Sequence, residues 1–311
     1  MSNEKIKIVF MGTPDFSVKT LDMLNNDSNI EVLCTITKVD TKSSRGQKIN
    51  FSEVKKYSIE HNIKCYQPDK IKNDTELINT IKRLNPDFIV VVAFGQILSK
   101  EILDIPKYGC INGHASLLPK YRGASPIQSM ILNGDKIVGT TTMLMSEGLD
   151  SGDILEQYSF EIADEETGGS LFDKLSDETA KLIIHTILNF QNINPIKQNE
   201  EEATYVKTIK KEDGRIDLEN ETAEYIERKI RAYNPWPSAY IYIDNKLFKI
   251  YKAKIIDNVD VKNLKIIQNN IYLSNTDMFF KTKNKYLQIL ELQPESKKRM
   301  SIQDYLNGYK N

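Results

Sequence analysis

Short apolar segments that alternate with helical patterns constrain the fold of this chain more than any other feature. Residues 6–11 form the first apolar segment, and residues 87–93, Asp-Phe-Ile-Val-Val-Val-Ala, form the most uniform one. A strand that is apolar at nearly every position is buried on both faces, which is typical of parallel sheets. Such strands, when helices separate them, form a sheet with helices on both faces. The pattern therefore predicts an α/β fold with a doubly wound, mainly parallel, Rossmann-like sheet in the N-terminal part.

The pattern changes near residue 192. Residues 192–204 are polar, contain Pro195 and an acidic run, and lack periodicity, which is typical of a linker. Beyond them, β-branched and aromatic residues alternate in short segments, which indicates a small OB-like β-barrel or strongly bent sheet. These segments are residues 240–243, 248–256, 271–273 and 287–292. We therefore expect a first domain at residues 1–191, a linker at 192–205 and a C-terminal β-barrel domain at 206–311.

The charge of the chain is divided unevenly between these parts. Residues 1–205 carry 22 Lys and Arg against 29 Asp and Glu, whereas residues 206–311 carry 20 against 14. A basic domain joined to an acidic one is one signature of a polyanionic partner. A Lys-rich solvated surface explains the same numbers, so charge alone does not decide between the two interpretations.

Cysteine usage and hydropathy exclude several classes of protein. The three cysteines, Cys34, Cys65 and Cys110, stand in apolar stretches and form no CxxC pair. This argues against a disulfide framework and against structural zinc. The first residues contain no long apolar stretch, and no run approaches eighteen apolar residues. We expect a monomeric cytoplasmic protein that contacts no membrane.

Polar residues that can carry chemistry follow the short apolar segment at residues 110–112. Asn112 and His114 stand where this strand is expected to end, and ligands of open parallel sheets bind beyond the carboxyl ends of strands. Residues two apart on an extended segment point the same way, so both side chains can reach one cleft. The other histidines, His61 and His185, lie in helical patterns that favour solvated or packing roles.

Three segments resemble the signatures of folate-dependent formyltransferases. They are residues 112–119, Asn-Gly-His-Ala-Ser-Leu-Leu-Pro, residues 121–128, Tyr-Arg-Gly-Ala-Ser-Pro-Ile-Gln, and residues 147–153, Glu-Gly-Leu-Asp-Ser-Gly-Asp. The Pro-Ile-Gln ending and the later Asn-Pro-Trp-Pro at 234–237 are similar to the members of the family that act on methionyl-tRNA. The resemblance extends from about residue 6 to about residue 306. One departure lies inside the first signature, where Gly113 replaces the usual branched apolar residue, such as Val.

The resemblance implies a reaction and the residues that perform it. The formyl group of 10-formyltetrahydrofolate is transferred to the amino group of methionine on initiator methionyl-tRNA, for translation initiation, without a metal ion. Asn112, His114 and Asp150 are the implied catalytic residues. The implied folate-binding residues are Phe94, Gly95, Gln96, Ile97, Leu98, Ser116, Leu117, Leu118, Pro119, Glu147, Gly148 and Leu149.

These residue types suit formyl transfer. Attack of an amine on the formyl carbon creates a tetrahedral intermediate with an oxyanion, and the Asn112 amide is a neutral donor for that oxygen. The imidazole of His114 can donate a hydrogen bond or move a proton. A carboxylate beside an imidazole, here Asp150, can take a proton from the amine and return one to the folate nitrogen.

Basic residues in two regions are implied contacts of the tRNA. In the family, the loop that corresponds to residues 38–48 usually has a Pro-Asp-Arg-Pro stretch and helps to grip the acceptor stem, whereas this chain has Val39, Thr41 and Lys42. The candidates for phosphate contacts are Lys42, Arg45 and Lys48 in this loop, and Lys207, Lys210, Lys297, Lys298 and Arg299 in the C-terminal domain.

Three other functions are compatible with parts of the pattern. A related formyltransferase that acts on an amino sugar is disfavoured by the Pro-Ile-Gln and Asn-Pro-Trp-Pro segments. A nucleotide-dependent oxidoreductase is disfavoured because the first strand ends at Gly-Thr-Pro rather than at GxGxxG. A non-catalytic RNA-binding protein is disfavoured because Asn112, His114 and Asp150 are all present.

Overall fold

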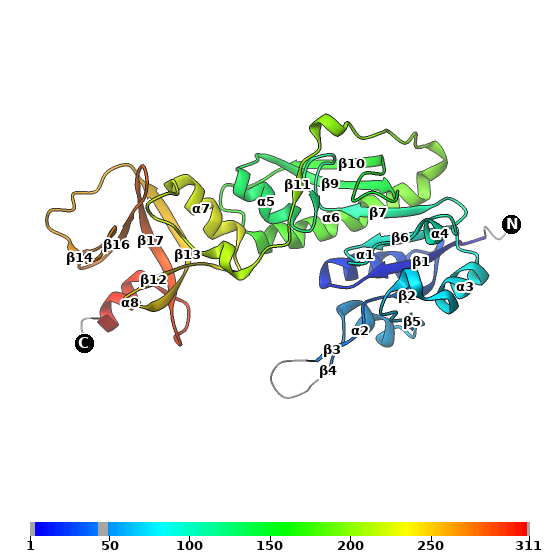
Figure 1. Ribbon diagram of the computed structural model, residues 1–311, viewed down its shortest axis with the longest axis horizontal. Coiled ribbons are helices and arrows are strands. Elements are labelled where there is room, and N and C mark those ends of the chain that lie inside the picture. Colours follow the sequence, from blue (N-terminus) through cyan, green and yellow to red (C-terminus); the bar gives the residue numbers. More distant parts are fainter. Residues whose placement is uncertain (1–3, 43–48, 310–311) are drawn as a thin grey trace. The chain divides into compact units, whose positions relative to one another are not determined.

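The computed structural model of the protein describes residues 4–42 and 49–309, which divide into two compact units (Figure 1). The first unit comprises residues 1–126, 137–161 and 172–206, and the second comprises residues 127–136, 162–171 and 207–311. The segment at 192–205 therefore belongs to the first unit. In the described ranges, no helix is long and apolar enough to cross a membrane.

A seven-stranded sheet forms the centre of the first unit, with the strand order β10-β9-β7-β6-β1-β2-β5. Five neighbouring strands are parallel, namely β7 (Cys110–His114), β6 (Phe88–Val92), β1 (Ile6–Gly12), β2 (Ile30–Ile36) and β5 (Cys65–Tyr66). β9 (Ile137–Leu144) and β10 (Asp153–Glu161) extend the sheet with antiparallel pairing. Every residue of β6 is buried, as its continuous apolar sequence predicts. The predicted doubly wound, mainly parallel sheet is confirmed.

Helices follow most of the parallel strands. They are α1 (Asp15–Asn26), α2 (Glu53–Glu60), α3 (Thr75–Leu84), α4 (Lys100–Leu103), α5 (Pro126–Asn133) and α6 (Gly168–Asn189). α2 and α3 begin where the side chains of Ser52 and Asp74 accept backbone N–H bonds, which satisfies donors that lack an intrahelical partner. α1 has no side-chain cap: Pro14 precedes the helix, and Asp15 lies in its first turn.

Several short elements connect the larger ones. They are the strands β3 (Thr41–Lys42), β4 (Ile49–Asn50), β8 (Arg122–Gly123) and β11 (Tyr205–Val206), and the 3-10 helices η1 (Ile71–Asn73), η2 (Phe190–Asn192), η3 (Glu200–Glu202) and η4 (Lys211–Gly214). β8 and β11 pair in parallel, with Arg122 opposite Tyr205. Two segments that are far apart in the sequence therefore lie side by side.

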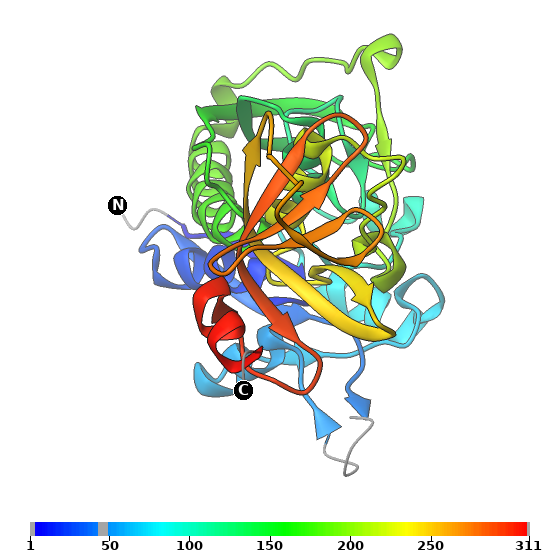
Figure 2. The same cartoon turned by 90° about the vertical axis from the view of Figure 1, so that its left-hand side faces the viewer.

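An antiparallel sheet forms the second unit, with the order β12-β13-β17-β16-β15-β14 and β18 beside β17. Its strands are β12 (Ala239–Ile243), β13 (Lys246–Ile256), β14 (Lys265–Gln268), β15 (Ile271–Leu273), β16 (Met278–Lys281), β17 (Tyr286–Pro294) and β18 (Met300–Ser301). Figure 2 shows that this sheet is strongly curved. The side chain of Gln268, on the edge strand β14, accepts from the Asp244 N–H at 3.2 Å, next to the other edge strand β12. The predicted β-rich C-terminal fold is confirmed, as a curled half-barrel.

Two helices accompany this sheet, α7 (Ala223–Ala232) and α8 (Ile302–Tyr309). α7 begins at Thr222, whose hydroxyl accepts from the Tyr225 N–H, and its apolar side chains Ile226 and Ile230 join the core of the half-barrel. The first turn of α7 carries Glu224, whose carboxylate accepts from Asn284 Nδ2 at 2.8 Å. Since a helix N-terminus also favours negative charge, the position stabilises the ionised form of this side chain.

The environment of Glu224 predicts how pH affects stability. The hydrogen bond from Asn284 lowers the pKa of Glu224 to about 2, helped by its own backbone N–H and by Lys285. A carboxyl whose pKa falls on folding contributes stability above its unfolded pKa of about 4.3, and that contribution is lost as the pH falls toward the folded value. We expect Glu224→Gln to lower the melting temperature at neutral pH by about 2–4 °C, the effect of about 1 kcal/mol in a chain of this size.

Thermal unfolding of the wild type and Glu224→Gln at pH 7 and at pH 3 checks this prediction. Glu219→Gln is the matched control, because Glu219 is an exposed carboxylate of the same unit. The difference between wild type and Glu224→Gln should shrink at the lower pH. An equal difference at both pH values would show that the ionised carboxylate is not the source of the stability.

Candidate active site

The carboxyl end of β7 carries Asn112 and His114 on alternate positions. β7 runs two residues further than the sequence predicts, because the antiparallel strand β9 pairs with it as far as Thr141 opposite His114. Asn112 is partly buried, and its side chain forms no hydrogen bond within residues 4–42 and 49–309. The amide is therefore free to donate to a bound molecule.

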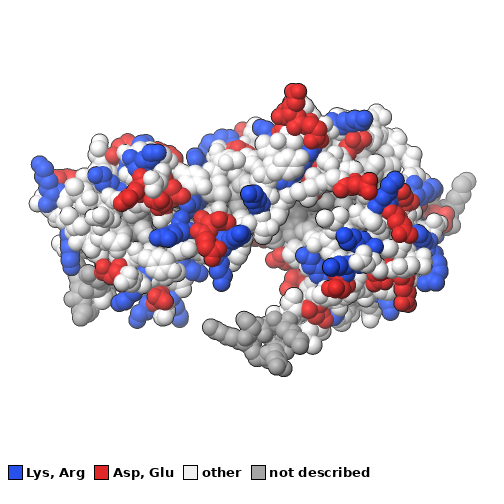
Figure 3. All heavy atoms as spheres, viewed as in Figure 1, with Lys and Arg blue, Asp and Glu red and all other residues white. Residues whose placement is uncertain are grey.

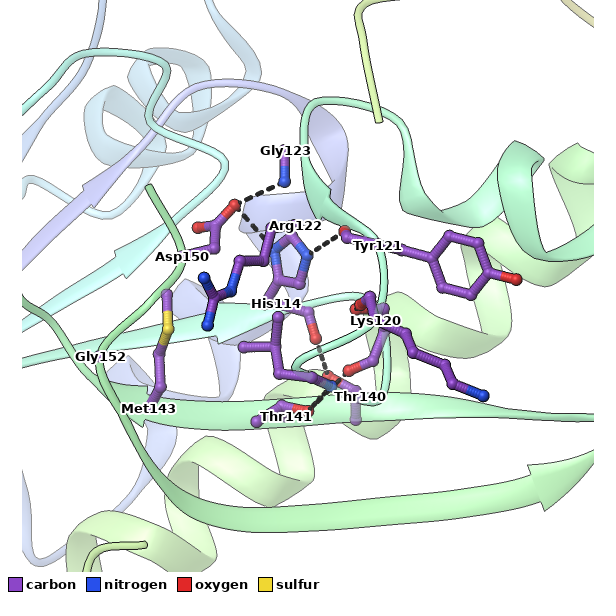
Figure 4. Close-up of polar contacts among 12 residues, drawn as sticks. His114, Lys120, Tyr121, Arg122, Gly123, Thr140, Thr141, Met143, Asp150 and Gly152 are labelled. Carbon is purple, nitrogen blue, oxygen red and sulfur yellow. Dashed lines mark hydrogen bonds and ion pairs between the residues drawn. The ribbon is translucent and has the colours of Figure 1, made fainter. Parts of the chain in front are cut away.

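The imidazole of His114 is buried and held by two neighbours (Figure 4). Its Nε2 atom lies 2.9 Å from the backbone oxygen of Tyr121. A carbonyl oxygen only accepts, so Nε2 carries a proton and donates it to this bond, and Nδ1 of the neutral ring is unprotonated. Nδ1 faces Asp150, 3.7 Å from Oδ2. The contact fixes the tautomer and leaves Nδ1 as the nitrogen that can take up a proton.

Asp150 reaches His114 from the loop between β9 and β10. Its Oδ2 atom accepts a hydrogen bond of 2.8 Å from the backbone N–H of Gly123. The residue has a φ of +48°, a left-handed conformation that is uncommon for residues other than glycine. The separation of 3.7 Å is within ion-pair range but is longer than a direct hydrogen bond. The carboxylate is thus placed to stabilise a positive charge on the imidazole.

Threonines of β9 fix the backbone that follows His114. Thr140 Oγ1 donates to the His114 oxygen at 3.0 Å, and Thr141 Oγ1 donates to the Ser116 oxygen at 2.6 Å. Thr141 Oγ1 also accepts from the Leu118 N–H at 3.1 Å. These threonines were not among the predicted site residues, although the run Thr140-Thr141-Thr142 next to apolar residues is a signal for hydroxyls that need partners when the segment is buried.

The structure divides the predicted folate-binding residues into packed and exposed groups. Phe94 and Leu98 are buried in the hydrophobic core, and Ser116 is buried with its hydroxyl donating to the Lys120 oxygen. The Gln96 side chain accepts from the Ile71 N–H and donates to the Pro68 oxygen. Leu117, Leu118 and Pro119 are half-buried or buried, and Gly95, Ile97, Glu147, Gly148 and Leu149 are exposed. Ile97 and Leu149, at 78% and 61% exposure, offer apolar surface.

Gly113 lies between the two strand residues and against helix α6. A Cβ atom at this position would lie 2.6 Å from Thr179 Cγ2 and 2.7 Å from Ile183 Cδ1. These distances are too short for carbon atoms, so the helix side chains occupy the space that a side chain at 113 would need. Close packing by α6 therefore takes the place of the branched residue that is usual in the family.

We expect Gly113→Val to destabilise the protein by about 1–3 kcal/mol, because it overpacks a filled core. Ile183→Ala, added to it, should recover part of the loss by removing the side chain that clashes. Urea unfolding of the two single variants and the double variant measures this coupling. Purely additive effects would mean that the two positions do not compete for one space.

The predicted tRNA-binding residues differ in their surroundings. Arg45 and Lys48 lie outside the described residues, and Lys42 is described only by its backbone position in β3. Lys207, Lys210, Lys297 and Lys298 are exposed. Arg299 instead donates twice to the Glu291 carboxylate and lies over the Tyr251 ring, 4.3 Å from its centroid. Figure 3 shows Lys and Arg side chains interspersed with Asp and Glu side chains on the visible face of the second unit.

No grouping of three or more His, Cys, Asp or Glu side chains suited to a metal ion occurs within the described part of the chain. The buried cysteines are not reactive thiols, because burial raises the pKa of Cys34 and of Cys110 to about 12. The His114–Asp150 pair brings two titratable groups close together at the site.

Comparison with known proteins gives a consistent result over nearly the whole chain. Residues 5–187 match the model of the family described as formyl transferase, and residues 208–310 match the formyl transferase C-terminal domain. The methionyl-tRNA formyltransferases of Agathobacter rectalis and Clostridium acetobutylicum are 46% and 45% identical over 305 residues. That match covers 97% of this chain and 96% of each relative.

Solved structures share the fold at lower identity. An N-formyltransferase from Helicobacter canadensis, in complex with folinic acid and dTDP-3-aminofucose, has a TM-score of 0.65 at 20% identity and covers 91% of this chain and 98% of its own. A sugar 3-N-formyltransferase has a TM-score of 0.66 at 22% identity and covers 95% and 100%.

Proposed function

This chain belongs to the formyl transferase family, and on that premise we propose that it transfers the formyl group of 10-formyltetrahydrofolate to the methionine of initiator methionyl-tRNA. Relatives of that printed activity, which match nearly the full length, support the acceptor. The observation that carries the chemistry is the approach of His114 Nδ1 to Asp150 Oδ2, at the strand end that also carries Asn112, whose amide has no hydrogen bond to the described residues. The three side chains provide the groups that acyl transfer to an amine requires.

In this proposal, Asn112 stabilises the oxyanion. Attack of the methionine nitrogen on the formyl carbon converts the formyl oxygen into an oxyanion, and the Asn112 amide donates to it. Two features support this role: the amide forms no hydrogen bond to the residues that the structure describes, and it is partly buried, where a donor stabilises developing charge more strongly than in bulk water.

His114 and Asp150 move the protons. The attacking nitrogen must lose a proton, and the folate nitrogen that leaves must gain one. We infer that Nδ1 of His114 takes up the first proton, in place of the Asp150 carboxylate that the residue types suggested, because the bond from Nε2 to the Tyr121 oxygen leaves Nδ1 unprotonated. The carboxylate of Asp150 stabilises the resulting imidazolium, and the same proton is then given to the leaving nitrogen. The hydrogen bond to the Tyr121 oxygen keeps the ring in the tautomer that this requires.

The folate lies, in this proposal, against the loops that follow the adjacent strands β6 and β7. These loops carry the predicted folate-binding residues 94–98 and 116–119. Residues 147–149 directly precede Asp150, whose carboxylate lies next to His114 at the end of β7. The exposed side chains of Ile97 and Leu149 supply apolar contact for a pterin ring. The solved relative with folinic acid supports a folate as the donor class.

The C-terminal domain, residues 206–311, provides tRNA affinity rather than chemistry. Its excess of basic side chains and the exposed Lys297 and Lys298 support this assignment. The domain division at 1–191, 192–205 and 206–311, the monomeric state and the cytoplasmic location complete the proposal. The alternative acceptor, an amino sugar, is favoured by the structural neighbours alone, which share 22% identity or less.

A competition between acceptors tests the proposal. The wild-type protein is given 10-formyltetrahydrofolate with initiator methionyl-tRNA, with free methionine, or with a nucleotide-linked amino sugar, and initial rates are compared. We expect fast transfer to methionyl-tRNA and little to the other two. Faster formylation of the amino sugar would replace the proposed acceptor by the alternative.

A further inference from the structure

Residues 196–206, hereafter the strap, lie along the backbone of the catalytic loops. At one end the backbones of Ile196 and Ile154 exchange two hydrogen bonds of 2.8 Å. At the other end β11 pairs with β8, so that Tyr205 lies opposite Arg122. Between these ends, the side chains of Gln198, Glu200 and Thr204 connect the strap to the segments that hold His114 and Asp150.

Gln198 is the contact between the strap and the Asp150 loop. Its Nε2 atom donates to the backbone oxygens of Asp150, at 2.9 Å, and of Gly152, at 2.7 Å. Its Oε1 atom accepts from Arg122 Nε at 3.0 Å and Nη2 at 2.8 Å. The Gln198 amide therefore binds the backbone carbonyl of Asp150. Asp150 has a left-handed backbone conformation, and such a conformation persists only where surrounding contacts stabilise it.

Arg122 anchors the strap from the opposite side. Its side chain is 1% exposed, and its guanidinium binds the strap residues Gln198, Glu200 and Tyr205. The two Glu200 contacts, at 2.8 and 2.9 Å, form a bidentate pair. Burial of a guanidinium costs free energy unless the group is paired and hydrogen-bonded. Because the strap supplies the acceptors for Arg122, it stabilises this side chain in its buried position.

The backbone around Arg122 reaches both catalytic side chains. The oxygen of the preceding residue, Tyr121, accepts from His114, and the N–H of the following residue, Gly123, donates to Asp150. Thr204, in the strap, accepts from the Tyr121 N–H at 2.8 Å. The strap therefore binds the Asp150 loop through Gln198, and the segment that orients both catalytic groups through Arg122 and Thr204.

We propose that the strap positions Asp150 against His114, with Gln198 and Arg122 as positioning residues for formyl transfer. This inference rests on the proposed function for its kinetic test. All of the strap except Val206 falls within the predicted linker at 192–205, and the proposal gives that segment a role in the geometry of the active site.

The first test is Gln198→Leu in the full-length protein. Leucine fills a similar volume but removes the donors to the Asp150 loop and the acceptor for Arg122. We expect kcat to fall about 10- to 100-fold, because small displacements of catalytic groups have large effects on rate. The KM values for folate and tRNA should stay within about threefold. Glu201→Ala is the matched control, since Glu201 is an exposed strap residue.

Hydrogen exchange of the Gly123 amide gives a readout that does not depend on activity. This amide donates to Asp150 Oδ2, so it should exchange faster in Gln198→Leu than in the wild type or in Glu201→Ala. A wild-type protein that fails to formylate methionyl-tRNA would overturn the proposed function, while the exchange of Gly123 would still test the strap.

A second variant guards against simple unfolding. Glu200→Gln weakens the bidentate pair with Arg122. The Glu200 side chain is 67% exposed, so the fold should tolerate this substitution. If Gln198 and Glu200 act through Arg122 as one device, the double variant should lose less in kcat than the product of the single losses. Three results would overturn the inference. The first is a double variant whose loss in kcat equals the product of the two single losses. The others are a Gln198→Leu variant that changes KM alone, and unchanged exchange of the Gly123 amide in that variant.

Discussion

Replacement of Asn112, His114 or Asp150 with alanine is expected to lower the single-turnover rate of formyl transfer by at least about 10²-fold. Asn112→Ala removes the donor to the oxyanion, a loss of roughly 3–4 kcal/mol in transition-state stabilisation. His114→Ala removes the nitrogen that takes up the proton. Asp150→Ala removes the carboxylate 3.7 Å from that nitrogen and the acceptor of the Gly123 N–H.

Rapid-quench measurements at saturating folate and tRNA give these rates directly. His185→Ala is the matched control, because His185 is a largely exposed histidine of α6 that contacts a carboxylate, Glu156, without belonging to the site. The control should retain the wild-type rate. A rate near that of the wild type for any of the three alanine variants would remove that residue from the catalytic set.

The second large effect concerns how tRNA affinity depends on salt. Phosphate contacts release counterions, so affinity should fall steeply as salt is added. Neutralisation of about five phosphates gives a loss of roughly 10²-fold for a fourfold increase in salt concentration. We expect the wild-type protein to show a dependence of this size with initiator methionyl-tRNA, measured by filter binding across a salt series.

The basic side chains at residues 297–299 should contribute unequally to the slope of log affinity against log salt concentration. Lys297 and Lys298 are exposed, and no ion pair involves either of them in the structure's described ranges. Replacing both with alanine should flatten the slope by roughly 1.5, the value for two phosphate contacts. Arg299→Ala is the comparison, because Arg299 already pairs with Glu291 and should change the slope less. Equal slopes for the wild type and the double variant would show that the two lysines do not contact tRNA phosphates.

The fold was largely predictable because its core strands carry strong periodic signals. Apolar strands such as β6, and helices with side-chain caps such as α3, are encoded within a few neighbouring residues. β10 was not predicted, because it is an edge strand in which Leu155 alone is buried and the other residues are half-exposed or exposed. β14 was missed for a similar reason, since none of its residues is buried. Exposed edges lose the pattern on which such predictions depend.

The candidate site was only partly predictable for a different physical reason. Asn112 and His114 are two residues apart on one strand, so their convergence follows from strand geometry. The pairing of Arg122 with Gln198 and Glu200 joins residues more than seventy positions apart, and no local pattern specifies which polar side chain will pair with a buried guanidinium. Likewise, only the packing of α6 explains why glycine stands at position 113.

We expect this protein to formylate the amino group of methionyl-tRNA with its Asn112, His114 and Asp150 side chains. Mass spectrometry of initiator methionyl-tRNA, after incubation with the protein and 10-formyltetrahydrofolate labelled with ¹³C in the formyl group, tests it most directly. Labelled N-formylmethionine should form on the tRNA with the wild-type protein, and a strongly reduced amount should form with His114→Ala at the same time point. Unmodified methionyl-tRNA after incubation with the folded wild-type protein would contradict it.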